Sequence, residues 1–409
     1  MANNKKQKNI PKGWSQILAG DIFSFVRTHA FSRENLTNGI SSNGNVGNIH
    51  YGDIHSTYNS LKINLEDTPI PIVNDKNFSP SKEDLLIDGD LVMADASEDY
   101  EGVGITVLID GLKDKMVVGG LHTFVLRDEK GATNKYYRQY IFRNPEVRNK
   151  LQKVANGVSV YGISKREVSK IILAIPSLEE QCDIVKILET WDEYLEKLSK
   201  KIKIKKDIKK GLMQKLLTGK VRLKGFNDEW EELRLSSICK KEDKTVRLSG
   251  DGLDFGKYPF FVNNTKDYNK YLEEYDFDGE YLIANTGGVA YFDYFNGKFA
   301  CMSDCFVFSS SCNTQFLFYW LKLRKRLINH IGFAGSGIKH LDKKWFLKQK
   351  IELSKNPKEQ QAIATILSTA DQEIEVLEQK KKIIEDQKKY LLNNLITGKI
   401  RLPEFKKVK

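Results

Sequence analysis

The sequence predicts an α+β protein in which two mixed α/β modules are separated by two long helices. The first observation is a helical segment that occurs twice without gaps, from Glu180 to Leu223 and from Glu359 to Leu402. Both ends of the second copy are displaced from the first by the same 179 residues. The second observation is that the stretches before the two copies differ in sequence. Two unlike modules, each followed by the same helix, are an arrangement that can hold two different surfaces at a fixed distance.

The helical copies divide the chain into five expected parts. A lysine-rich start precedes the first tryptophan, and each module begins near a tryptophan. The parts are an N-terminal basic arm at 1–13, the first module at 14–175, a central helix region at 176–224, the second module at 225–353 and a C-terminal helix region at 354–409.

The composition favours a polyanionic partner and argues against a membrane protein. Of the 409 residues 40% are hydrophobic, and the mean hydropathy is −0.45. A net charge of +11 favours nucleic acid as the partner, with a merely solubilising surface charge as the alternative. The cysteines are too few for a disulfide framework, no apolar run approaches the roughly 20 residues of a membrane helix, and the N-terminal segment is not a signal peptide. We therefore expect a cytoplasmic protein.

Apolar residues along both helical copies recur at spacings of four and three, the heptad pattern of a coiled coil. Each helix can bury this narrow seam against the other, with Trp191 opposite Ala370. The alternative is an ordinary hairpin that sets no spacing. The seam consists of Ile184, Leu188, Trp191, Leu195, Leu198 and Ile202 in the first copy, and of Ile363, Leu367, Ala370, Ile374 and Leu377 in the second.

Both copies also carry matching start and stop signals. Ser177 is a good N-cap, with Glu180 as its capping-box partner. In the second copy Asn356 takes the cap position. Gly219 and Gly398 are suited to the left-handed conformation that ends a helix. From cap to glycine each helix has about 40 residues and measures about 60 Å.

Within the modules, short apolar stretches predict strands and longer periodic stretches predict helices. In the first module we expect strands at 91–94, 104–109, 121–126 and 171–175, and helices at 134–149, 145–154 and 165–170. In the second we expect strands at 281–285, 305–308 and 348–353, and a helix at 316–331. The similar order of elements with different residues indicates duplication followed by divergence.

Loops of both modules carry side chains suited to contact with DNA. Asparagine amides can bind adenine edges, glycines let the backbone approach a groove, and backbone amides near a lysine can hold a phosphate. Turn-rich loops are also common for structural reasons alone. The candidates are Asn43, Asn45, Asn48, His50 and Tyr51 in the first module, and Asn263, Asn264, Lys266, Asn285, Thr286, Gly335, Ser336, Lys339 and His340 in the second.

The motifs that would indicate catalysis are not matched. The stretch 250–258 has the wrong glycine spacing for a phosphate loop, and 144–147 is not the motif of an amino-methyltransferase. Cys301, Cys305 and Cys312 lack a second ligand pair for zinc. We therefore expect a binding protein with no catalytic residue and no metal site.

Two unlike modules, each followed by the same long helix, resemble the specificity subunit of type I restriction-modification systems. The short marks of this resemblance lie at 175–181 and 216–220 around the first helix, and at 357–361 and 395–399 around the second. The glycine-rich stretch 332–337 is similar to a loop near the end of the family's target-recognition domains. Each mark is short, but their recurrence at one offset makes the resemblance specific.

The resemblance implies that each module is a target-recognition domain for one half of a split, asymmetric site in double-stranded DNA. It also implies that the helices pack antiparallel as a coiled-coil spacer, which relates the domains by a pseudo-two-fold axis. Two methyltransferase subunits and the restriction (motor) subunits would be the partners. S-adenosylmethionine, ATP and magnesium would belong to those partners, and this chain would bind no cofactor. The alternative is a coiled-coil scaffold with two protein-binding heads and no role at DNA.

Overall fold

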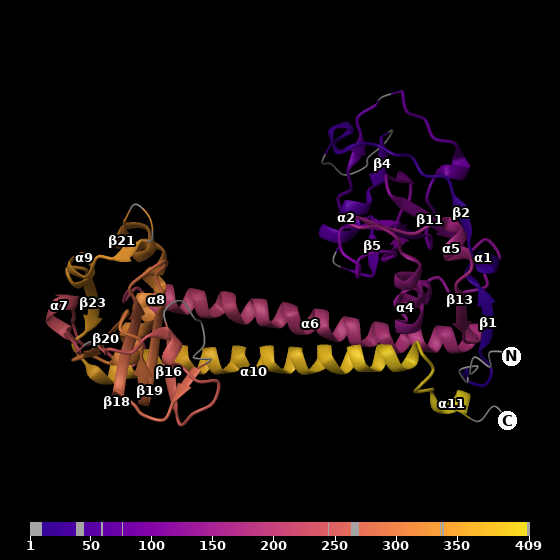
Figure 1. Cartoon of the computed structure of the whole chain (residues 1–409). Helices are drawn as coiled ribbons and strands as arrows, with labels where there is room; N and C mark the ends of the chain where they lie inside the picture. Colours follow the sequence, from indigo (N-terminus) through magenta and orange to yellow (C-terminus); the bar gives the residue numbers. More distant parts are fainter. Residues whose placement is uncertain are drawn as a thin grey trace. The chain divides into compact units, whose positions relative to one another are not determined.

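The computed structural model of the chain contains two compact units. The structure describes residues 10–37, 45–58, 60–75, 77–243, 245–262, 270–335, 337 and 339–406. The first unit contains the chain up to Glu196 and from Lys382 onward, and the second contains Lys197–Lys381. Each of the two long helices, α6 (Leu178–Leu216) and α10 (Pro357–Leu395), therefore contributes to both units (Figure 1).

The first unit is built on a five-stranded and a four-stranded sheet. Successive residues of the central strand β7 alternate between two cores: Leu91 and Met93 enter one, and Val92 and Ala94 enter the other. The five-stranded sheet has the order β2 (Ser24–Val26), β11 (Thr123–Arg127), β7 (Leu91–Ala94), β9 (Thr106–Asp110), β5 (Lys62–Asn64); the four-stranded sheet has the order β10 (Met116–Gly119), β4 (Val46–Ile49), β6 (Ile72–Val73), β3 (Leu36–Thr37).

Short elements complete the first unit around these sheets. The expected strands in this unit are confirmed within two residues at each end. The short elements are α1 (Ala19–Ile22), η1 (Arg33–Asn35), α2 (Tyr51–Ser56), η2 (Lys82–Asp84), β8 (Ala96–Ser97) paired with β12 (Tyr161–Gly162), α3 (Arg138–Ile141), α4 (Pro145–Val154), α5 (Lys165–Ser169) and α11 (Pro403–Lys406).

The predicted helix over 134–149 is wrong, because the chain breaks between α3 and α4. The side chain of Asn144 caps α4 by accepting a hydrogen bond from the N–H of Glu146 at 2.9 Å, and Pro145 takes the first helical position. Proline has no N–H to donate and restricts the residue before it, so the helix cannot continue through this point.

The second unit is built on one six-stranded sheet packed against the helix α8 (Thr314–Ile331). Its order is β15 (Cys239–Lys241), β20 (Cys305–Ser310), β18 (Phe277–Asn285), β19 (Phe292–Cys301), β16 (Tyr258–Phe261), β17 (Lys270–Leu272). The ten-residue strand β19 was not predicted, because its polar centre around Asn296 and Gly297 hides the apolar alternation. The remaining elements are α7 (Leu235–Ile238), η3 (Ser249–Asp251), α9 (Lys343–Leu347) and the pair β21 (Phe333–Ala334) with β22 (His340–Leu341).

In both units the first and last strands of the module pair with each other. β1 (Ser15–Leu18) lies antiparallel to β13 (Ile172–Ile175), and β14 (Trp230–Arg234) lies antiparallel to β23 (Lys350–Ser354). The closing strands were predicted and the opening strands were not. Each two-stranded ribbon places the entrance of the module beside the start of the long helix.

The predicted helix starts are confirmed, with one change. The N–H of Glu180 donates to Ser177 Oγ at 3.3 Å, and the N–H of Lys358 donates to Asn356 Oδ1 at 3.0 Å. The carboxylate of Glu180 does not return to the cap as a capping box requires, because it accepts from Arg401 Nη2 at 2.6 Å instead.

The predicted helix stops are also confirmed. Gly219 and Gly398 have φ angles of +66° and +67°, in the left-handed region. Aromatic side chains lie close to both glycines: an added Cβ at Gly219 would lie 3.2 Å from Trp230, and one at Gly398 would overlap Pro11 and lie 3.2 Å from Trp14. Both the backbone angle and the space favour glycine at these two positions.

Within each unit, α6 and α10 run antiparallel. In the second unit Lys205 pairs with Glu373 and, one turn further along α6, Lys209 pairs with Asp371. In the first unit the corresponding side-chain pairs are Glu180–Arg401 and Asp192–Lys388.

The seam faces inward, but it does not serve the helix pair alone. Ile184 and Leu188 join the core of the first module, and Ile363 and Leu367 join that of the second. The predicted opposition of Trp191 and Ala370 is wrong, because Ala370 precedes Asp371 and therefore lies across from α6 near residue 209. The buried seam residues are Ile184, Leu188, Leu198, Ile202, Ile363, Leu367 and Ile374, and the half-buried ones are Trp191, Leu195, Ala370 and Leu377.

Candidate functional site

A buried glutamate at the start of each long helix anchors the end of the other copy. In the first unit Glu180 accepts from Arg401 at 2.6 and 2.9 Å and from the indole of Trp14 at 3.1 Å. The second unit repeats this set with the glutamate, arginine and tryptophan at the matching places: Glu359 accepts from Arg222 Nε and Nη2, both at 2.7 Å, and from Trp230 Nε1 at 3.3 Å. Both carboxylates are almost fully buried, so each depends on its arginine.

A glutamine in the first turn of each helix binds the module beside it. Gln181 Oε1 accepts from the N–H of Asn134 at 2.7 Å, and Gln360 Oε1 accepts from the N–H of Asn313 at 2.8 Å. The glutamine Nε2 groups donate to backbone carbonyls at the entrance of the helix, Pro176 in one unit and Ser354 in the other.

A third repeated set lies further along the helices. In the second unit Tyr319 donates to Asp371 at 2.9 Å, and Lys209 pairs with the same carboxylate. In the first unit Lys388 pairs with Asp192, and this carboxylate helps to raise the pKa of Tyr140, after the larger effect of burial.

Apart from the two tryptophans, all members of the three sets obey the offset of the helical repeat, which therefore extends into the modules. Asn134 and Asn313 are 179 residues apart, and so are Tyr140 and Tyr319. The starts of the modules are separated by more, because Trp14 and Trp230 are 216 residues apart. The first module therefore has 37 more residues than the second between its tryptophan and its asparagine. The residues that attach the modules to the long helices are thus alike, whereas the stretches of the modules between these residues differ.

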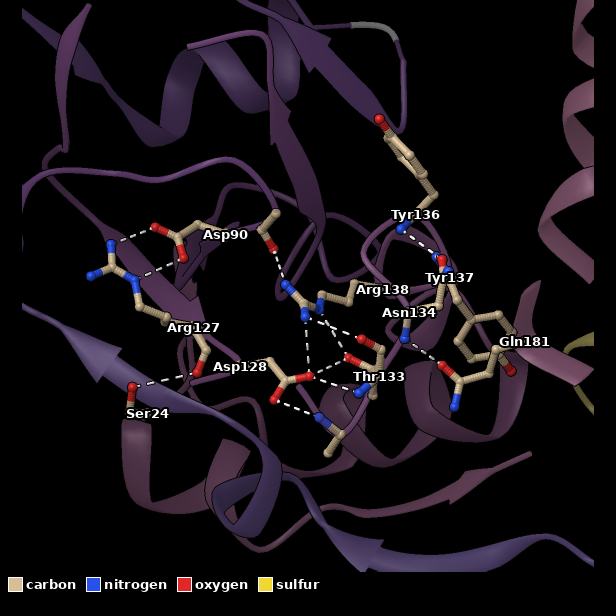
Figure 2. A network of polar contacts seen from close by, with 12 residues as sticks. Ser24, Asp90, Arg127, Asp128, Thr133, Asn134, Tyr136, Tyr137, Arg138 and Gln181 are labelled. Atoms are coloured by element: carbon tan, nitrogen blue, oxygen red, sulfur yellow. Dashed lines mark hydrogen bonds and ion pairs between the residues drawn. The ribbon is translucent and has the colours of Figure 1, made fainter. Parts of the chain in front are cut away.

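A polar network in the first module positions Asn134 for its contact with Gln181 (Figure 2). The carboxylate of Asp128 accepts from the N–H groups of Ala132 and Thr133 at 3.0 and 2.8 Å, and from Thr133 Oγ1 at 2.7 Å. It also pairs with Arg138 Nη2 at 3.2 Å. Burial acts to raise the pKa of Asp128, but these hydrogen bonds and the charge of Arg138 outweigh it, and the pKa lies below its usual value.

Replacing Asp128 by asparagine is expected to destabilise the first unit by on the order of 2 kcal/mol at neutral pH, because charge-assisted hydrogen bonds are lost. A carboxyl with a lowered pKa contributes stability above its unfolded pKa, and this contribution is lost as the pH falls through the folded value. The difference between Asp128→Asn and the unchanged protein should therefore shrink from about pH 7 to about pH 3. Urea unfolding at both pH values measures it, and a difference that stays constant with pH would contradict the assignment.

The candidates of the first module do not share one kind of environment. Asn45 is exposed at the start of β4, whereas Asn48 is fully buried and donates to the carbonyl of His29 at 3.1 Å. His50 is buried and caps α2 by accepting from the N–H of Gly52 at 3.0 Å. Burial lowers the pKa of His50. Asn48 and His50 thus stabilise this segment, whereas Asn45 faces solvent; these are the two asparagines of the group that the structure describes.

An aromatic cluster around Tyr51 was only partly predicted. The ring of Tyr51 lies 4.7 Å from that of His50 and 5.3 Å from that of His122, measured between ring centres. His122 has a positive φ of 52°, which is uncommon outside glycine, and its Nδ1 lies 3.3 Å from Asp95 Oδ1. A histidine inside the stretch predicted as a strand, 121–126, gives no sign of this contact in the sequence. Its half-exposed side chain adds a hydrogen-bonding group to the predicted surface.

In the second module the structure brings two predicted segments together. Asn285 is buried, donates to the carbonyl of Gly287 at 3.0 Å and accepts from the N–H of Tyr291 at 2.7 Å, so it shapes the loop. The N–H of Gly288 donates to the carbonyl of Lys339 at 2.8 Å, which joins this loop to the second segment. The candidates Gly335, Lys339 and His340 are exposed and Thr286 is half-buried.

Five candidates, Asn43, Asn263, Asn264, Lys266 and Ser336, lie outside the described residues. Among the residues that the structure does describe, no group of three or more His, Cys, Asp and Glu side chains is placed to hold a metal ion. A hydrogen bond with Cys305, together with burial, raises the pKa of the Cys301 thiol. In this described part, no helix has the length and apolar character needed to cross a membrane.

The structure therefore contains two modules with different outer loops, each attached to the long helices through equivalent contacts. The comparison with protein families agrees with this arrangement. A family model described as the type I restriction modification DNA specificity domain matches residues 11–206 and again residues 227–386. The chain belongs to this family. Each match contains one module and most of the following helix, so the two modules are the two DNA-specificity domains of a type I specificity subunit.

Known specificity subunits are similar to this chain. The putative type I restriction enzyme MjaX specificity subunit of Methanocaldococcus jannaschii is 28% identical over 423 residues, covering 96% of this chain and 95% of the relative. The MjaVIII specificity subunit of the same organism is 28% identical over 314 residues, covering 64% of this chain and 70% of the relative. The crystal structure of a type I S subunit from M. genitalium has the same fold, with a TM-score of 0.60 at 16% identity and coverage of 96% and 97%.

Proposed function

We propose that each module of this specificity subunit recognises one half of a bipartite DNA site, and that α6 and α10 set the gap between the halves. The observation that carries the proposal is the combination of repeated anchors and divergent modules. The Glu–Arg–Trp, Asn–Gln and Tyr–Asp–Lys sets recur at matching positions, while the sheets between them differ. Equivalent attachment of two unlike readers suits recognition of an asymmetric site.

The chemistry of modification would come from partner subunits. The chain would act as the non-catalytic recognition component, and two methyltransferase subunits would dock on the helices and methylate adenine. These subunits would carry S-adenosylmethionine, and the restriction subunits would use ATP and magnesium. The net charge of +11 suits attraction to the phosphate backbone, to which loop side chains would add base recognition.

Methylome sequencing tests this function in a host that expresses the methyltransferase partner. Adding the gene for this chain should create one split adenine motif that is absent without it. Exchange of residues 235–349 for the corresponding stretch of another specificity subunit should change one half of the motif and leave the other half and the gap unchanged. This exchange keeps β14, β23 and the Glu359 set in place.

Two outcomes would contradict the proposal. If no split motif depends on the chain although the partner is expressed, the chain does not direct methylation. If the exchange changes both halves, the modules do not act separately. The scaffold with two protein-binding heads has no support from the family match.

A further inference from the structure

A basic pocket in the second unit is not among the predicted DNA contacts. Its volume is about 590 Å³, and it lies between the end of α6 and the exposed face of α8. The cations that line it are Lys210 from α6 and Lys322, Lys325 and Arg326 from α8; Met213, Gln214, Val289, Leu323 and Asn329 complete the lining.

The charged side chains that line this pocket are all positive. The described residues that line it include no Asp or Glu, and none of its four cations forms an ion pair within the described part of the chain. Desolvation and the nearby ammonium of Lys209 lower the pKa of Lys322, and they outweigh the opposite effect of the Asp371 and Asp293 carboxylates. The ammonium of Lys325 is a second positive charge that lowers the pKa of Lys322, and it lies 5.3 Å from the centre of the Tyr291 ring. An anion in the pocket would relieve this repulsion.

The pocket adjoins the loop that carries predicted DNA contacts. Val289 lines the pocket, is 57% exposed and belongs to the loop that begins with the candidates Asn285 and Thr286. The N–H of Ala290 donates to Asn329 Oδ1 at 2.9 Å, which fastens the loop to α8. On the other side of the same loop, the N–H of Gly288 donates to the carbonyl of Lys339. The loop thus connects the pocket to the second candidate segment.

We propose that this pocket binds phosphate groups of the DNA backbone beside the half-site that the second module recognises. The inference rests on the proposed function, because it extends the same DNA-binding surface. Lysine supplies mobile point charges and arginine a two-pronged donor, both of which suit phosphate oxygens. Continuity with the candidate loop favours a DNA phosphate over the carboxylates of a protein partner. Contacts of this kind add affinity and orientation without selecting a base.

The test measures DNA binding by the full chain assembled with its methyltransferase partner. Labelled duplexes carry either the methylated motif or a scrambled sequence, and salt is varied from about 50 to about 200 mM. The double variant Lys325→Gln/Arg326→Gln should bind both duplexes more weakly, by roughly tenfold for each lost phosphate contact at about 100 mM salt. The slope of log affinity against log salt should fall by about 0.9 per contact, and the preference for the motif should stay unchanged.

A matched control removes the same charge elsewhere in the second unit. Arg324, whose guanidinium lies 4.8 Å from the Trp320 ring centre, and Lys358 are exposed and do not line the pocket. The variant Arg324→Gln/Lys358→Gln should leave the salt slope near that of the unchanged complex. Lys325→Arg, which keeps the charge, should also retain binding.

The outcomes separate this inference from the proposed function. If the unchanged complex shows no preference for the motif, the proposed function fails. If it shows the preference and Lys325→Gln/Arg326→Gln keeps the full salt slope, the pocket does not hold phosphate. If the double variant instead fails to assemble with the methyltransferase while its thermal unfolding is unchanged, the pocket binds a protein carboxylate, and the inference is overturned.

Discussion

Replacing Arg401 with alanine is expected to destabilise the first unit by about 3–5 kcal/mol, because it leaves the buried charge of Glu180 without its partner. The side chain of Glu180 is 2% exposed, and two hydrogen bonds from Arg401 compensate for its burial. Trp14 would remain as a donor, but one neutral N–H cannot replace a guanidinium. The effect should be local to the start of α6 and the end of α10.

Hydrogen exchange followed by mass spectrometry can locate this effect in the full chain. Arg401→Ala should speed exchange at 178–188 and 391–396 and leave 357–367 unchanged. Arg222→Ala is the matched control, because it removes the equivalent partner of Glu359 and should have the opposite pattern. Adding Glu180→Gln to Arg401→Ala should restore part of the protection, since the uncharged amide costs less to bury. If the double variant exchanges as fast as Arg401→Ala, the unpaired charge is not the cause.

Lengthening both long helices by one heptad is expected to widen the gap in the recognised DNA site by about three base pairs. One heptad adds about 10 Å of helix, and stacked base pairs rise by about 3.4 Å each. The insertions belong after Ile202 in α6 and after Gln379 in α10. At these positions the ion pairs Lys205–Glu373 and Lys209–Asp371 lie on one side of the insertions, and the pair Lys388–Asp192 lies on the other side.

The single insertions provide the control for this experiment. An insertion in α6 alone should break the antiparallel register and abolish methylation. The double insertion should restore methylation at the wider site with unchanged half-site sequences. Its rate should be lower, because about three base pairs also turn one half-site by roughly 100° around the DNA axis. A change in the half-site sequences with a constant gap would rule out the spacer role.

The long helices were predictable because their signals are local and repeated. The cap at Ser177 and the stops at Gly219 and Gly398 depend on neighbouring residues, and the structure places them as expected. The pairing of Trp191 with Ala370 was wrong because a heptad pattern gives the face of a helix and not its register against a partner.

The parts that the sequence did not reveal depend on contacts between distant residues. Asn134 and Tyr140 match Asn313 and Tyr319 at the offset of the helices, but two identities within so short a stretch do not stand out in the sequence. The sequence also does not show whether the side-chain amide of an asparagine is exposed or buried. Asn48 was predicted at a DNA surface, and the structure uses it inside the first module.

The ribbon formed by the first and last strands has a consequence for how such a gene can change. Because β1 pairs with β13 and β14 with β23, each module leaves the framework at nearly the point where it entered. Material added or lost between these strands does not move the ends, which explains how one module can carry 37 residues more than the other up to its asparagine. Recombination within a module therefore leaves the attachment points intact, and a new DNA specificity can be acquired as a cassette.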